Sequence, residues 1–164
     1  MKRLTENQYF VCKLQGKVFE LSLTRCECSS SIFIRRFMNS EIVKAFENET
    51  ISISTIDQNN VIEILEEEYG KLTHGKKLYS PNEMFWIGYF YRVLGFYFDL
   101  TSKAILRLLP PEKIRKFYYI GHTFDPEYAA ERIIEETDYD PDYTKRWIEI
   151  YKELLKEKEA SHLS

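Results

Sequence analysis

The segment 80–98 constrains the fold of this chain more than any other part of the sequence. Ser80, Pro81 and Glu83 predict the start of a helix, with serine at the N-cap, proline at the first helical position and glutamate at the third. Behind them, aromatic and apolar side chains occupy nearly the whole circumference of the expected helix. Such a helix needs other helices around it, so the segment predicts the centre of a helical bundle.

Arg92 lies near the middle of this segment, and its charge limits the environments in which the helix can lie. The apolar run 84–98 is shorter than a bilayer requires and contains this charge, which indicates a core helix and no membrane span. A guanidinium in a core is costly unless it is paired or stacked. Arg92 is therefore either a structural residue, stacked on aromatic rings or paired with a carboxylate, or an exposed anchor for a partner. Gly88 and Gly95 lie on one side of the helix and are expected to let a neighbouring helix approach closely.

Further helix starts are marked along the whole chain. Polar N-cap residues precede apolar stripes with helical spacing, and prolines stand at the first position of several expected helices. The caps are Thr5, a serine within 26–31, Ser40, Asp57 or Asn59, Thr101, Asp125 and Asp140, and the prolines are Pro111, Pro126 and Pro141. We therefore predict an all-α fold, an irregular multi-helix bundle of about seven helices around a central aromatic-rich helix.

The length of the chain predicts one domain. With 164 residues it can bury a hydrophobic core without disulfides or metal, so a single helical domain over 1–164 is expected. N-terminal helices are expected over 1–48 and the main bundle over 57–164. Between them, residues 51–54 alternate apolar and polar with a period of two, which predicts a short extended linker over 49–56.

The charge of the chain narrows the classes of partner, and its cysteine usage indicates a cellular location. The 23 basic and 26 acidic residues leave a net charge of −3, so the chain has no global electrostatic footprint for nucleic acid. A nucleic-acid partner is not expected, although a local basic patch stays open. Three cysteines leave one unpaired in any disulfide scheme, which favours reduced thiols and a cytoplasmic location. Residues 1–10 lack the apolar run of a secretory signal.

Sequence motifs of known enzyme chemistry are absent. There is no glycine-rich phosphate loop, no G-x-S-x-G elbow and no H-E-x-x-H helix. Cys26 and Cys28 lack a nearby histidine pair, so we expect no metal and no cofactor. His122 precedes the expected helix start at Asp125 and either packs there or serves in catalysis. Two alternatives to a binding protein therefore stay open: a small enzyme using His122 with a nearby carboxylate, and a helix-turn-helix-like nucleic-acid binder using Leu21–Phe37.

Several separated segments together resemble a known group of proteins. They are Arg36-Phe37-Met38-Asn39-Ser40, Tyr79-Ser80-Pro81, the run Phe85 to Arg92, Thr101-Ser102-Lys103, His122-Thr123-Phe124-Asp125-Pro126 and Glu131-Arg132-Ile133. Over roughly residues 30–136 the chain resembles small uncharacterised bacterial proteins often encoded beside ADP-ribosyltransferase-like toxins. The resemblance implies an antitoxin or accessory role with the neighbouring toxin as protein partner. The tail beyond Asp138 has no counterpart there, and is either a partner-wrapping segment or an extra core helix.

We therefore predict a non-enzymatic protein-binding module. Tyrosine and arginine combine a large contact area with polar reach and are frequent interface anchors. The segments that carry the resemblance concentrate on the central aromatic helix and on residues 122–132. The predicted partner-binding residues are Tyr91, Arg92, His122, Asp125 and Arg132. The sequence leaves the oligomeric state open.

Overall fold

The computed structural model describes residues 2–51 and 57–163. Within these residues the chain forms helices and no strand, which confirms the all-α prediction. The described residues form nine helices instead of about seven, although the sequence marks starts for the two short ones at Ser40 and Thr101. They are α1 Glu6–Arg25, α2 Ser30–Met38, α3 Val43–Glu47, α4 Gln58–Tyr69, α5 Pro81–Phe98, α6 Ser102–Leu108, α7 Pro111–Gly121, α8 Pro126–Ile134 and α9 Pro141–Leu163. Most of the predicted extended linker over 49–56 lies outside the described residues.

Local capping chemistry sets where most of these helices begin. Thr5, Asp57 and Ser80 each form a capping box. In each box the N-cap side chain accepts a hydrogen bond from the amide of the third helical residue, and the side chain of that residue accepts one from the N-cap amide. Ser29 and Thr101 cap α2 and α6 through their hydroxyl groups. These bonds satisfy amides that have no partner within the helix, so the predicted starts are observed.

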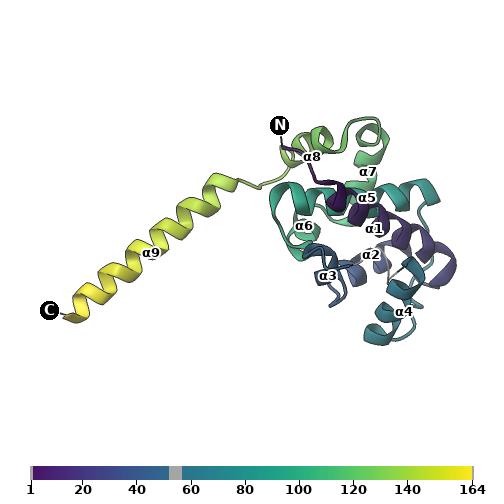
Figure 1. Ribbon diagram of the computed structural model, residues 1–164, viewed down its shortest axis with the longest axis horizontal. Coiled ribbons are helices and arrows are strands. Elements are labelled where there is room, and N and C mark those ends of the chain that lie inside the picture. Colours follow the sequence, from purple (N-terminus) through teal and green to yellow (C-terminus); the bar gives the residue numbers. More distant parts are fainter. Residues whose placement is uncertain (1, 52–56, 164) are drawn as a thin grey trace.

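Helix α5 lies within the bundle and packs mainly along α1 (Figure 1). It also contacts α3, α6, α7 and α8. At Gly88 a Cβ atom would lie 2.6 Å from Cγ of Phe19 and 2.8 Å from the backbone oxygen of Gln15. Gly88 therefore lets the two helices approach closely, as predicted. Gly95 does not, because its nearest neighbours are Nη1 of Arg92 on its own helix and the oxygen of Leu100.

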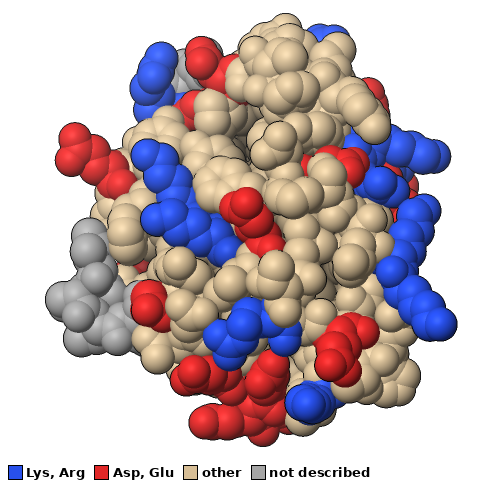
Figure 2. All heavy atoms as spheres, turned by 90° about the vertical axis from the view of Figure 1, so that its right-hand side faces the viewer, with Lys and Arg blue, Asp and Glu red and all other residues tan. Residues whose placement is uncertain are grey.

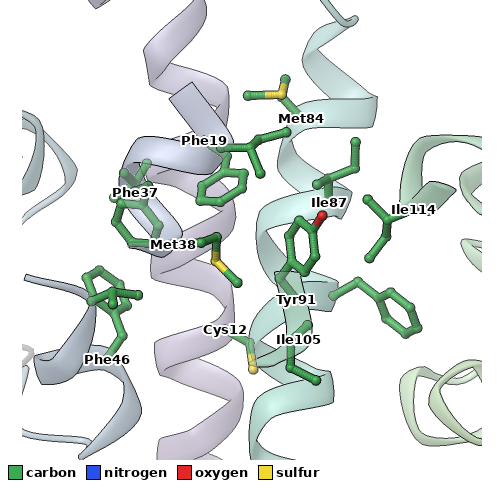
Figure 3. Close-up of a cluster of buried hydrophobic side chains, with 14 of the residues drawn as sticks. Cys12, Phe19, Phe37, Met38, Phe46, Met84, Ile87, Tyr91, Ile105 and Ile114 are labelled. Atoms are coloured by element: carbon green, nitrogen blue, oxygen red, sulfur yellow. The ribbon is translucent and has the colours of Figure 1, made fainter. Parts of the chain in front are cut away.

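Aromatic rings from different helices meet where α1, α2 and α5 come together (Figure 3). The ring of Phe19 lies 5.4 Å from that of Phe33 and 5.2 Å from that of Phe37, and both pairs are edge-to-face. Phe46 from α3 adds a further edge contact to Phe37 at 5.3 Å. Edge-to-face pairs are favoured by the ring quadrupole, so these contacts fix how the helices are oriented around α5.

Helix α9 extends away from the bundle (Figure 1). Every side chain of α9 that the structure describes is exposed, whereas α4 to α8 all contribute buried residues to the core. The tail beyond Asp138 is therefore not an extra core helix in this structure. In the described part of the chain, no helix has both the length and the apolar character needed to span a bilayer.

Candidate partner-binding surfaces

Tyr91 lies inside the core and offers no surface to a partner. Its side chain is fully buried, and its hydroxyl donates a hydrogen bond of 2.7 Å to the backbone oxygen of Leu109. Burial raises the pKa of Tyr91 well above its usual value, so the phenol remains a hydrogen-bond donor. The structure thus corrects the prediction of Tyr91 as a partner-binding residue and gives it a structural role between α5 and the end of α6.

Arg92 is also a core residue, being only 1% exposed. Its Nε donates to Oε1 of Gln15 at 2.8 Å, and its Nη2 donates to Oγ of Ser102 at 2.6 Å. The guanidinium carbon lies 5.7 Å from the ring centroid of Phe96. Burial lowers the pKa of Arg92 to about 10, so the group is still charged at neutral pH. The structural interpretation of Arg92 holds, and its prediction as an exposed anchor is corrected.

His122, Asp125 and Arg132 are exposed, near the ends of α7 and α8. Nδ1 of His122 lies 2.6 Å from the backbone oxygen of Tyr118, and the two rings stack at 4.5 Å. Asp125 occupies the N-cap position of α8 without a side-chain capping bond. Arg132 lies 3.7 Å from Glu135 in a solvated pair, which contributes little to stability. The five predicted residues therefore divide into two in the core and three on the surface.

The buried carboxylates of the described chain are already engaged with other partners. Glu83 accepts from Nε of Arg115 at 2.9 Å and links α5 to α7. Glu127 accepts from the hydroxyl of Tyr9 and links α8 to α1. His122 is hydrogen-bonded to neither of them, and its Nδ1 is occupied by the backbone of its own helix. Acid–base chemistry needs a carboxylate and an imidazole in mutual reach, so this geometry gives no support to the enzyme alternative.

The segment Leu21–Phe37 contains the end of α1, a turn and α2. A helix-turn-helix reader places the N-terminal residues of its second helix against base edges in the major groove. Here the segment that precedes α5 lies over that end of α2. The amide of Ser29 donates to the oxygen of His74 at 2.8 Å, and the amide of Ser30 donates to the oxygen of Lys77 at 3.0 Å. This cover argues against the helix-turn-helix alternative.

Helix α9 carries six of the ten large apolar side chains that are exposed in the described part of the chain. Their exposed fractions run from 44% to 62%. They are Trp147, Ile148, Ile150, Tyr151, Leu154 and Leu155, and we call them the α9 stripe. Steps of three and four residues place them on one side of the helix. Glu149, Lys152 and Lys156 lie on the opposite side, so α9 is an amphipathic helix whose apolar side faces water.

A second exposed apolar group lies where α7 and α8 meet. Tyr119 is 74% exposed, Ile120 55% and Tyr128 42%, and the ring of Phe124 lies 5.0 Å from that of Tyr128. Figure 2 shows an area without charged side chains at the top of its view, the end of the bundle where α7 and α8 lie. Exposed apolar side chains gathered at one end of a molecule are typical of interaction sites, and His122 belongs to the same end of α7.

Sequence spacing could not have distinguished the α9 stripe from a buried one. The same three- and four-residue steps occur in the core-facing stripe of α1. The available signal was the high density of charged residues over 152–159, which leaves little apolar surface for a core beyond Leu155.

Neither a metal site nor a similarity to known proteins identifies a function for the surfaces described above. Among the described residues, no three histidine, cysteine or acidic side chains are grouped so that they could hold a metal ion. Comparison with known proteins finds no matching family model, no similar curated protein and no similar solved structure.

Proposed function

We propose that this protein is a non-enzymatic protein-binding module and that it holds its partner with the α9 stripe. The supporting observation is the exposure of that stripe on a helix that extends from the bundle (Figure 1). Amphipathic helices bind proteins by laying such a face into an apolar groove, with anchors three, four and seven residues apart. Ile148, Tyr151 and Leu155 have this spacing. The partner we propose is therefore a protein with an apolar groove and with charged residues of both signs along the rim of that groove.

The size of the stripe indicates that the partner makes additional contacts. Burying the exposed half of an aliphatic or aromatic side chain contributes on the order of 1 kcal/mol, so the stripe contributes on the order of 6 kcal/mol before association costs. A micromolar complex needs about 8 kcal/mol net. Association itself costs at least about 4 kcal/mol, so contacts beyond the stripe are needed. We propose that the apolar surface at Tyr119, Ile120 and Tyr128, with His122 beside it, supplies part of this difference.

The identity of the partner is proposed from the resemblance alone. It implies a toxin encoded beside this chain, which the protein would bind and neutralise as an antitoxin or accessory component. We also propose a cytoplasmic location, for which the free thiols of Cys12, Cys26 and Cys28 are the supporting observation.

The test is capture of the neighbouring gene product by the tagged chain of 164 residues. Tyr151→Glu with Leu154→Glu places two charges in the stripe and should reduce capture at least tenfold. The matched control is Glu149→Ala with Lys156→Ala on the opposite side of α9, which should leave capture unchanged. Circular dichroism at 222 nm should be the same for all three proteins, because none of these side chains is in the core.

Three results would contradict the proposal. Capture that survives both glutamate substitutions would show that α9 is not the binding element. Undiminished toxicity of the neighbour on co-expression would remove the antitoxin role. Self-association of the purified protein that is lost in the glutamate variant would identify a second copy of the chain as the occupant of the stripe.

A further inference from the structure

A hollow of about 400 Å³ lies between α2 and the segment that joins α4 to α5. It is lined by Ile32, Arg35, Arg36, Asn39, Tyr69 and His74. None of these residues is acidic, and three of them, Arg35, Arg36 and His74, are basic. The volume falls within the range of small-molecule sites, roughly 300–1,000 Å³.

The wall of this hollow that carries His74 is held in place by its backbone. The oxygens of Leu72, His74 and Lys77 accept hydrogen bonds of 2.8 to 3.0 Å from amides of the α1–α2 turn and the first residue of α2. Gly75 has a φ of +79°, and a Cβ there would lie 2.7 Å from Oγ of Ser29. Only glycine combines this left-handed conformation with so close an approach. The segment is thus fixed against α2, and His74 is brought beside Arg35 and Arg36 by the fold.

The two arginines are available to a ligand. Both are exposed on the outward face of α2. The guanidinium of Arg36 lies 5.1 Å from the ring centroid of Tyr69, a cation–π contact that orients it. Arg35 lies 3.6 Å from Glu112, but both side chains are at least half exposed, so this pair is weak and easily replaced.

We infer that this hollow binds a small organic phosphate of about the size of a mononucleotide. Arginine guanidinium groups match the geometry of phosphate oxygens and bind them through paired hydrogen bonds. Arg35 and Arg36 hold the phosphate, with His74 as a third donor. Ile32 and the ring edge of Tyr69 contact the apolar or aromatic part of the ligand. The site stands apart from the α9 stripe and does not depend on the partner proposed for it.

Isothermal titration calorimetry with AMP, adenosine and inorganic phosphate tests the site on the full chain at low ionic strength. AMP should bind at least fivefold more tightly than inorganic phosphate and at least tenfold more tightly than adenosine. Arg35→Gln with Arg36→Gln should weaken AMP binding at least tenfold. Lys13→Gln with Lys17→Gln removes the same charge from the exposed face of α1 and should leave AMP affinity within twofold.

Each other outcome overturns the inference. These are absence of AMP binding at millimolar concentration, equal affinity for AMP and inorganic phosphate, or AMP affinity that survives the arginine substitutions. Equal losses in the arginine and lysine variants would show general charge attraction instead of a site. A single-stranded oligonucleotide that binds while AMP does not would identify the surface as a polyanion surface.

Discussion

Replacing Gly88 with alanine should disturb the contact between α1 and α5. The new Cβ would lie 2.6 Å from Cγ of Phe19 and 2.8 Å from the backbone oxygen of Gln15. Carbon atoms in optimal contact are about 3.5–4.0 Å apart, so the neighbours must move by roughly 1 Å. A ring can rotate, but a backbone oxygen moves only with its helix. The substitution therefore has to separate two helices that pack along most of their length.

The expected loss of stability follows from two opposing effects. Overpacking of a core costs about 1–3 kcal/mol, and a clash with backbone belongs near the upper end. Alanine in a helix interior is favoured over glycine by about 1 kcal/mol. The free energy of unfolding should therefore fall by about 2 kcal/mol. For a chain of this length that corresponds to a decrease in Tm of about 4–8 °C.

Urea denaturation followed by circular dichroism at 222 nm measures this change, and Gly95→Ala is the matched control on the same helix. At Gly95 the nearest atoms would be 3.2 and 3.3 Å from the new Cβ, so the neighbours need to move by only a few tenths of an ångström. We expect its free energy of unfolding to stay within about 1 kcal/mol of the native value, because strain and helix propensity nearly cancel. A Gly88→Ala protein as stable as the native one would refute the packing inferred here.

Arg92→Met should lower the free energy of unfolding by about 1–3 kcal/mol because it leaves Oε1 of Gln15 without its donor. In a double-mutant cycle with Gln15→Leu, strictly additive losses of stability would contradict this coupling. Burial alone would raise the pKa of Glu83, but hydrogen bonds from Arg115 and from its N-cap residue lower it below the usual value. The ionised carboxylate therefore stabilises the fold at neutral pH, and this contribution is lost as the pH falls through the folded-state pKa. Between about pH 5 and pH 3 the native protein should lose more stability than Glu83→Gln, and parallel curves would exclude the linkage. Burial raises the pKa of the Cys12 thiol to about 12, so peptide mapping after treatment with a thiol reagent at pH 8 should find Cys12 unmodified until urea unfolds the chain.

The helices could largely be predicted because their signals are local. Ser80, Pro81 and Glu83 lie within four residues of one another, and the capping bonds that they make involve only those residues and their amides. The same holds for Thr5 with α1 and Asp57 with α4. Local chemistry also marks the two short helices, since Ser40 accepts from the amide of Val43 and Thr101 from that of Ala104. Helices of five and seven residues nevertheless depend on the tertiary packing around them, so the expected total was too low.

The candidate site was predicted less well, because exposure is not a local property. Tyrosine and arginine are common both in interfaces and, when hydrogen-bonded, in cores. The sequence left both roles open for Arg92, and the structure places it in the core through a bond to Gln15, 77 positions away. His122 needed no distant partner, since its ring and its Nδ1 both contact Tyr118 on the same helix.

The sequence by itself determined the all-α class, the starts of the main helices and the need to surround α5. Caps and helical periodicity act within one or two turns, so they operate before any distant contact forms. Only the tertiary structure decided which apolar faces are covered. The stripe of α1 is buried against α5, whereas the stripe of α9, with the same spacing, faces water. The tertiary structure also brought His74 beside Arg35 and Arg36. The backbone hydrogen bonds that do this join segments more than forty residues apart, and how the helices pack decides them.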